Sequence, residues 1–268
     1  TIIDEHSKQG VVGFLGEGIN DALALKRADI GFVVSNGSDV ARQAGDVILL
    51  EKSLKPIVQA IIMSRQAFLK IRTYLLCTLT GNIGTLLSLT AVVLFSQIIP
   101  MLPIQILLNN LLTDLPLLFL ITDRVSNKSL EQPIKNPIKP FFKTILIYAA
   151  ISSLFDFLFF FAFKQYDISI LRTGWFVFSV LAELTLVFSL RSELSIFKAP
   201  KMSAPLAIVI GICYALALSL PFLQFGPIFR FVPLSIMQIS AIIGLSLIYL
   251  VTNELVKAGL RWRNRPLS

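Results

Sequence analysis

The sequence has 268 residues, of which 55% are hydrophobic, and its mean hydropathy is +0.77. Soluble chains contain roughly 45–50% apolar residues, so this composition argues against an ordinary soluble enzyme and predicts a membrane protein. The formal net charge is +8, but the basic residues are scattered between apolar runs rather than gathered in one patch, which argues against nucleic-acid binding. We therefore expect the lipid bilayer, and no nucleic acid, as a partner.

The first fifty residues have the pattern of an α/β domain. Short apolar runs predict three strands, at residues 11–15, 30–34 and 46–50. Helical spacing predicts two short helices between them, at residues 20–28 and 38–44, the second capped by Ser38. Strands that alternate with helices indicate a parallel sheet. Fifty residues cannot cover both faces of such a sheet, so we expect residues 1–53 to be the C-terminal part of a larger domain.

The turn after the first predicted strand carries three polar side chains, Glu17, Asn20 and Asp21. It lies at the carboxyl end of a strand, where open α/β sheets bind their ligands. Taken alone, the pattern fits an ordinary capped turn as well as a ligand site.

Residues 54–268 predict a stalk helix followed by six membrane spans. Pro56 suits the first turn of a helix, and few helix breakers follow before residue 95. The first half of this helix is polar and the second half is nearly uncharged, so one helix could run from the soluble domain through the bilayer. The six spans are expected near residues 74–95, 103–121, 142–163, 175–190, 205–223 and 234–251.

Basic residues distinguish the two sides of the predicted membrane domain. With the N-terminal part in the cytoplasm, twelve flanking Lys and Arg residues fall inside and three fall outside. The positive-inside rule requires this bias, so we expect the C-terminal tail to be cytoplasmic too. The inside residues are Arg124, Lys128, Lys135, Lys139, Lys143, Arg191, Lys198, Lys201, Lys257, Arg261, Arg263 and Arg265, and the outside residues are Lys164, Arg172 and Arg230.

The second span has a carboxylate, Asp114, near its middle. A charge at this depth costs at least about 2.5–3.5 kcal/mol, so it rarely occurs without a partner or a function. Asn110 shares a helix face with Asp114, Thr113 lies beside them, and Pro116 deprives the carbonyl of residue 112 of its helical partner. These oxygen donors suit a hard cation. The alternative is a kinked helix whose Asp114 pairs with a buried basic group, although no Lys or Arg lies at comparable depth in the neighbouring spans.

Three further polar residues in the spans are candidates for the same site. Glu183, in the fourth span, is the better of two additional acids, and Asn82 in the first span is placed to face Asp114. Asp156, in the third span, is the other acid. Its alternatives are a polar partner on a neighbouring helix or a place near the outer vestibule.

Several motifs resemble those of P-type ATPases. The hinge motif of that family, Gly-Asp-Gly-x-Asn-Asp-x-Pro-Ala-Leu, is similar to residues 16–25, Gly-Glu-Gly-Ile-Asn-Asp-Ala-Leu-Ala-Leu. The Asn-x-x-Thr-Asp cluster of the sixth membrane helix in calcium-type pumps is similar to residues 110–114, and residues 81–84, Gly-Asn-Ile-Gly, are similar to the fifth helix. The resemblance implies a mainly α, polytopic membrane protein preceded by the end of a haloacid-dehalogenase-like phosphorylation domain.

The resemblance also implies site residues and partners. Asn82, Asn110, Thr113, Asp114 and Glu183 would be ion ligands. Glu17, Asn20 and Asp21 would be catalytic, with Glu17 and Asp21 at the Mg²⁺ that accompanies ATP in the intact pump. Residues 50–54 and 99–105 look like bacterial magnesium-transporting ATPases, and Thr85 stands where calcium pumps carry glutamate. We therefore expect a divalent cation, Mg²⁺, as cargo, and a bacterial inner membrane as the location.

Two residues depart from the family pattern: Glu17 replaces aspartate and Leu23 replaces proline. The phosphorylated aspartate, the actuator loop, the nucleotide-binding domain and the first four membrane helices of the family have no counterpart in these residues. We expect the chain to need this N-terminal part, covalent or separate, and not to hydrolyse ATP alone. The alternatives are a pump for calcium or another cation, a non-catalytic split-gene remnant that acts as a membrane partner, and a passive channel or secondary transporter.

Overall fold

A computed structural model describes residues 2–51, 53–126, 130 and 138–263 of the chain. The chain divides into two compact units, residues 1–64 and 65–268, each of which is described by itself. The C-terminal tail from residue 264, with Arg265, lies outside the described residues, as do Lys128 and Lys135. The side chain of Arg263 is likewise not described.

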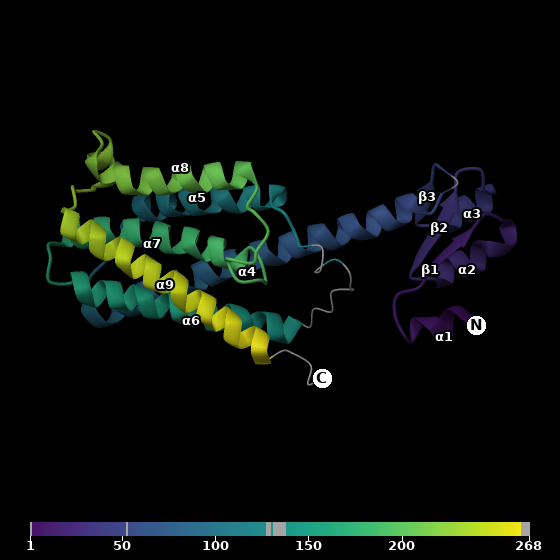
Figure 1. The fold of residues 1–268 in the computed structure, drawn as a ribbon, viewed down its shortest axis with the longest axis horizontal. Coiled ribbons are helices and arrows are strands. Elements are labelled where there is room, and N and C mark those ends of the chain that lie inside the picture. The colour runs from purple at the N-terminus through teal and green to yellow at the C-terminus, as the bar shows by residue number, and fades with distance from the viewer. Residues whose placement is uncertain (1, 52, 127–129, 131–137, 264–268) are drawn as a thin grey trace. The chain divides into compact units, whose positions relative to one another are not determined.

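The first unit contains a three-stranded sheet that is parallel, as the sequence predicted, and its strand order is β1-β2-β3 (Figure 1). Gly13 pairs with Ile30, and Phe32 pairs with Val47. The strands are β1 (Gly13–Gly16), β2 (Ile30–Val34) and β3 (Val47–Leu49), and the helices are α1 (Ile2–Ser7), α2 (Ala22–Arg27) and α3 (Asp39–Ala44). A 3-10 turn, Ile19–Asp21, precedes α2.

A small core holds α2 and α3 against the sheet. It is made of Leu25, Val33, Ala41 and Ala44, all of which are buried. Ser38 caps α3 as predicted, because its hydroxyl accepts a hydrogen bond from the backbone N–H of Ala41 at 3.2 Å. Other apolar strand residues remain exposed in the described part of the chain, namely Leu15, Ile30, Val47 and Ile48.

The second unit is a bundle of membrane helices. Six described helices are long and apolar enough to cross a membrane, which confirms the predicted number of spans. The 42-residue helix α4 begins in the first unit and continues into the second. The six helices are α4 (Lys55–Ser96), α5 (Pro103–Phe119), α6 (Ile138–Phe163), α7 (Ile168–Leu190), α8 (Ala204–Ser219) and α9 (Ile236–Arg263).

Apart from α4 with its predicted stalk, helices α7 and α9 extend furthest beyond the predicted spans. Helix α7 begins at Ile168 rather than near residue 175, because the charged Arg172 belongs to its first turns. The Arg172 Nε donates to the backbone carbonyl of Ile99 at 2.9 Å. This contact accommodates the charge, so Arg172 ends the apolar stretch of the sequence but does not end the helix. Helix α9 similarly continues past residue 251 through the buried Asn253 and Lys257.

Helix α7 is the centre of the bundle. Helices α5, α6, α8 and α9 all pack against it, and Figure 1 shows it between α6, α8 and α9. Its side chains are covered on nearly every face, as is typical of a helix that is apolar all round. Trp175 and Phe178, for example, are fully buried and both contact the ring of Phe159 on α6.

Helices α4 and α6 approach closely at Gly84. A Cβ atom added to Gly84 would lie 2.8 Å from the Cβ atom of Ser152, so only glycine leaves room for this contact. The hydroxyl of Ser153 donates to the Gly84 carbonyl at 2.9 Å. Small residues let membrane helices pack closely, and Gly84 has this role between α4 and α6.

Candidate ion site between three helices

The carboxylate of Glu183 lies where α4, α5 and α7 meet. Its Oε1 accepts a hydrogen bond from Asn109 Nδ2 on α5 at 3.1 Å, and the Ser179 hydroxyl lies at 3.5 Å. On α4, Gly81 leaves space for the carboxylate, because an added Cβ atom would lie 3.5 Å from Glu183 Oε2. A glycine on α4, an amide on α5 and a hydroxyl on α7 therefore surround one partly buried acid.

A cavity of about 10 Å³ adjoins this carboxylate. Such a volume is near the lower limit for a single water molecule, so the described helices hold a site of atomic size rather than an open channel. The cavity is lined by Cys77, Thr78, Asn82, Thr113, Asp114, Leu117, Glu183, Leu186 and Val187.

Four of the five predicted ion ligands line this cavity. Thr113 is buried, whereas Asn82 and Asp114 are also exposed on the surface of the bundle. Among the described residues, Asp114 forms no ion pair. Helix α5 also continues through Pro116 to Phe119. A buried basic partner for Asp114 is therefore not observed in the described part of the chain.

Asn110 is the predicted ligand that the described helices do not bring to the cavity. It is exposed, on the same side of α5 as Asp114, while its neighbour Asn109 is buried and contacts Glu183. One residue along an α-helix turns the side chain by about 100°, which separates the two amides. The sequence contained a signal for Asn109, since it precedes Thr113 by the same four-residue spacing that joins Asn110 to Asp114.

The remaining buried acid, Asp156, has a separate partner. Its Oδ2 lies 2.6 Å from the hydroxyl of Ser88, which donates to it from α4, and Asp156 does not line the cavity. This is the polar partner on a neighbouring helix that the sequence left open as an alternative to ion contact.

The turn between β1 and α2 is held by Asp21. Its Oδ2 accepts hydrogen bonds from the backbone N–H groups of Gly18 at 2.9 Å and Glu17 at 3.0 Å. These two donors stabilise the carboxylate and lower the pKa of Asp21 below its ordinary value of 3.8. A Cβ atom on Gly16 would lie 2.7 Å from the Asp21 Cβ atom, so the turn also requires that glycine.

The other two predicted catalytic residues, Glu17 and Asn20, are exposed at the same turn. Carboxylate and amide oxygens are the hard donors that Mg²⁺ prefers, so the residues present fit this metal. The described residues contain no group of three His, Cys, Asp or Glu side chains able to hold a metal by themselves. Any further ligands at this turn would have to come from elsewhere.

Known proteins similar to this chain include cation-transporting ATPases. Residues 98–259 match the family described as "Cation transporting ATPase, C-terminus". Over 254 residues, 92% of the chain, it is 31% identical to "Magnesium-transporting ATPase, P-type 1" of Escherichia coli K12. The chain belongs to the P-type cation-transporting ATPases. Within this family it matches the C-terminal portion of the pump, with its six membrane helices.

Two more relatives show the breadth of the match within the P-type ATPases. The chain is 30% identical over 264 residues, 96% of its length, to "Magnesium-transporting ATPase, P-type 1" of Salmonella typhimurium LT2. It is 30% identical over 207 residues, 73% of its length, to "Calcium-transporting ATPase" of Bacillus subtilis 168. The chain spans 28%, 29% and 23% of the lengths of the E. coli, Salmonella and Bacillus proteins.

Proposed function

We propose that this chain forms the ion-binding C-terminal part of an ATP-driven pump that carries Mg²⁺ across a bacterial inner membrane. The observation that supports this most is the position of Glu183, whose carboxylate borders the same cavity as Asp114 within the membrane-spanning helices of a P-type ATPase. The magnesium-transporting relatives, which match more than nine-tenths of the chain, support Mg²⁺ as cargo.

The donor set of the cavity suits a cation that keeps part of its water shell. Two carboxylates, an amide and a hydroxyl are offered by Asp114, Glu183, Asn82 and Thr113. Mg²⁺ dehydrates reluctantly and is usually held by one or two carboxylates. Asn82, Asn110 and Asp114 are exposed at membrane depth, where polar groups are costly unless they are covered. We expect another helix of the intact pump to cover them and to complete the ligand set.

The turn at Glu17 would act in phosphoryl transfer. In the intact pump, Glu17 and Asp21, with Asn20 beside them, would lie at the Mg²⁺ that accompanies ATP. The two backbone hydrogen bonds to Asp21 Oδ2 would keep the turn in shape. The metal would neutralise charge on the phosphate oxygens. Glu17 is one methylene longer than aspartate, so its carboxylate reaches further from the turn. ATP hydrolysis would also require the remaining domains of the pump.

The orientation of the chain completes the proposal. The ends of α5, α7 and α9 and the starts of α6 and α8 carry most of the flanking basic residues. By the positive-inside rule this end faces the cytoplasm, together with the first unit and the C-terminal tail.

The test is ion-stimulated ATP hydrolysis by the intact protein in proteoliposomes. Asp114→Asn and Glu183→Gln should each reduce the Mg²⁺-stimulated rate at least ten-fold, whereas Asp156→Asn, which removes a buried acid outside the cavity, should keep most of it. If Asp114→Asn and Glu183→Gln kept the ion dependence of the wild type, the assignment of the site would be wrong.

Ca²⁺ is the second candidate cargo, because the calcium-transporting Bacillus relative matches 73% of the chain. The same assay separates the two ions. The only Mg²⁺ in this measurement is the Mg²⁺ bound to ATP. If micromolar Ca²⁺ then stimulates hydrolysis, Ca²⁺ is favoured as cargo. If micromolar Ca²⁺ does not stimulate hydrolysis, Mg²⁺ is favoured.

A further inference from the structure

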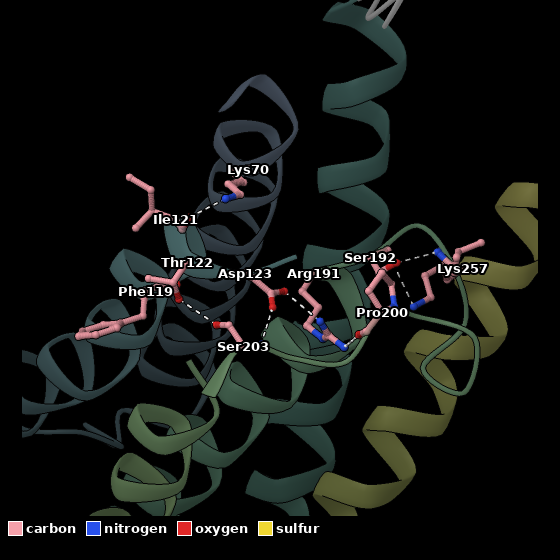
Figure 2. Close-up of polar contacts among 11 residues, drawn as sticks. Lys70, Phe119, Ile121, Thr122, Asp123, Arg191, Ser192, Pro200, Ser203 and Lys257 are labelled. Atoms are coloured by element: carbon pink, nitrogen blue, oxygen red, sulfur yellow. Dashed lines mark hydrogen bonds and ion pairs between the residues drawn. The ribbon is translucent and has the colours of Figure 1, made fainter. Parts of the chain in front are cut away.

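A second cavity, of about 370 Å³, lies at the opposite end of the contacting helices from the α6–α7 connection, and it shares no residue with the ion site. Its walls come from α4, α6, α7 and α9, and from the segment that follows α5. Figure 2 shows the polar contacts around it. The volume falls within the range of roughly 300–1,000 Å³ that is usual for small-molecule sites.

The lining of this cavity is strongly basic. Six basic side chains line it, whereas its acidic side chains are Asp123 and Glu193. Apolar residues such as Leu69, Leu76 and Leu260 form part of the wall. The basic residues are Lys70, Arg72, Arg124, Arg191, Lys257 and Arg261.

Three of the basic residues are held in place by ion pairs. Arg191 contacts Asp123 at 2.9 Å, with both side chains buried, and Arg72 contacts Glu193 at 2.6 Å. Lys257 pairs with Glu254 of its own helix, and its Nζ donates to the Ser189 carbonyl at 2.6 Å. These contacts fix the geometry of the cavity without neutralising the rest of its charge.

The other three basic residues have no acidic partner among the described residues. Lys70 Nζ donates only to the backbone carbonyl of Ile121, at 2.5 Å, and Arg124 and Arg261 form no ion pair. Like charges gathered around one cavity repel each other, so an anion in the cavity would relieve an unfavourable arrangement.

Two donors in the cavity also lack acceptors in the described part of the chain. Arg72 Nε is buried without a hydrogen bond. Tyr148 is 2% exposed and lines the cavity, and no hydrogen bond to its hydroxyl is formed. The Arg72 Nε is enclosed by protein, whereas the Tyr148 hydroxyl opens on the cavity and is free to donate. An anion in the cavity would give the Tyr148 hydroxyl an acceptor.

We propose that this cavity binds a phosphate group. Guanidinium groups favour phosphate because their N–H groups match two of its oxygens, and the cavity offers both arginines and lysines. Basic pockets between membrane helices on the cytoplasmic side are typical sites for phospholipid head groups, and the apolar wall would accommodate the glycerol part of a lipid. A soluble phosphate has the same charge chemistry, so lipid and free phosphate are the two sources to separate.

The test is native mass spectrometry of the intact protein in neutral detergent with phosphatidylglycerol added. Diacylglycerol with the same acyl chains, which lacks the phosphate, is the lipid control. We expect one tightly retained phosphatidylglycerol and no retained diacylglycerol. Arg124→Gln/Arg261→Gln should weaken retention at least ten-fold, whereas Lys198→Gln/Lys201→Gln, which removes two exposed charges at the same end of the bundle but outside the cavity, should change it less than two-fold.

Tyr148→Phe is a second variant, which removes only the hydroxyl and keeps the buried ring. It should weaken retention several-fold even if the double arginine variant folds poorly. Millimolar inorganic phosphate is then added. Free phosphate is the natural source if it displaces the lipid, or if it raises the melting temperature of the wild type but not of Arg124→Gln/Arg261→Gln. Lipid retention insensitive to inorganic phosphate would identify the head group. Three outcomes would overturn the proposal. They are retention of diacylglycerol as strong as that of phosphatidylglycerol, wild-type lipid retention by Tyr148→Phe, and equal losses of lipid retention in the two double variants.

Discussion

At the scale of single residues, Asn109 and Asn110 form a natural matched pair. Replacing Asn109 by leucine removes the donor at 3.1 Å from Glu183 and leaves this carboxylate with the hydroxyls of Thr113 and Ser179. We expect a loss of about 1–3 kcal/mol in the free energy of unfolding. Asn110→Leu, on the exposed side of α5, should change it by less than about 0.5 kcal/mol. Denaturation in mixed detergent–SDS micelles measures both variants, and equal losses would contradict the assignment of the two faces.

Asp21 gives the turn of the first unit a pH dependence. The pKa of its carboxyl is lowered in the folded chain by hydrogen bonds from Gly18 and Glu17. The stabilisation is therefore present above the ordinary pKa of 3.8, and it is lost as the pH falls through the lowered, folded-state pKa. Hydrogen-exchange protection of the peptide around residues 16–21, corrected for intrinsic rates, should fall over that range.

Asp21→Asn tests the origin of this effect, because asparagine keeps the size of the side chain and loses its titration. The variant should show lower protection near neutral pH and little further change on acidification. Glu17→Gln, at an exposed position of the same turn, should retain the wild-type profile. A wild-type profile in Asp21→Asn would show that another group titrates.

The sequence predicted most of the candidate ion site because residue type carries much of the information. A carboxylate within an apolar span is conspicuous wherever it lies, so Asp114 and Glu183 were found directly. Asn109 was missed because spacing along a helix fixes the angle between two side chains but not which of them faces the neighbouring helix. That orientation depends on the packing of α5 against α7, which brings together residues 74 positions apart.

At the scale of elements, close packing between α4 and α6 depends on Gly84. An alanine there would place its Cβ atom 2.8 Å from that of Ser152, so the helices would have to separate. We expect Gly84→Ala to cost about 1–3 kcal/mol of unfolding free energy, as overpacking usually does. Gly211→Ala, on α8, is the matched control, since an added Cβ atom meets no heavy atom within 4 Å. It should be neutral or slightly stabilising, and a comparable loss at both positions would argue against the packing explanation.

Elements with a simple periodic signal were predicted well, and those whose ends depend on tertiary contacts were not. The three strands lie within two residues of their predicted bounds, because glycine turns and apolar runs mark them locally. Helices α7 and α9 extend beyond the apolar spans predicted for them. Arg172 and Lys257 interrupt the apolar windows there, yet each reaches a backbone carbonyl and allows the helix to continue.

At the scale of the whole membrane unit, the buried pair Asp123–Arg191 joins three segments that are distant in sequence. Arg191 also donates to the Pro200 carbonyl at 2.5 Å, and Asp123 accepts from the Ser203 N–H at 3.0 Å (Figure 2). Arg191→Met should cost about 3–5 kcal/mol, because it leaves Asp123 buried without its counter-charge. The double variant Asp123→Asn/Arg191→Met should lose less than the sum of the two single variants.

A thermodynamic cycle measured by SDS titration tests this coupling. The exposed pair Asp39–Arg42 serves as a contrast, since Arg42→Gln should change stability by no more than about 1 kcal/mol. Strictly additive losses at Asp123 and Arg191 would mean that the two side chains stabilise the unit independently.

The two polar faces of α5 also have a consequence for how the protein is made. Helix α5 leaves the ribosome before α7, so Asn109 has no Glu183 to contact until 74 further residues have been synthesised. During that interval a helix with Asp114 near its middle and two amides must enter the bilayer, at a cost of a few kcal/mol for the acid alone. The contact between Asn109 and Glu183 therefore forms only after α7 has entered the bilayer, and the buried face of α5 stays incomplete until then.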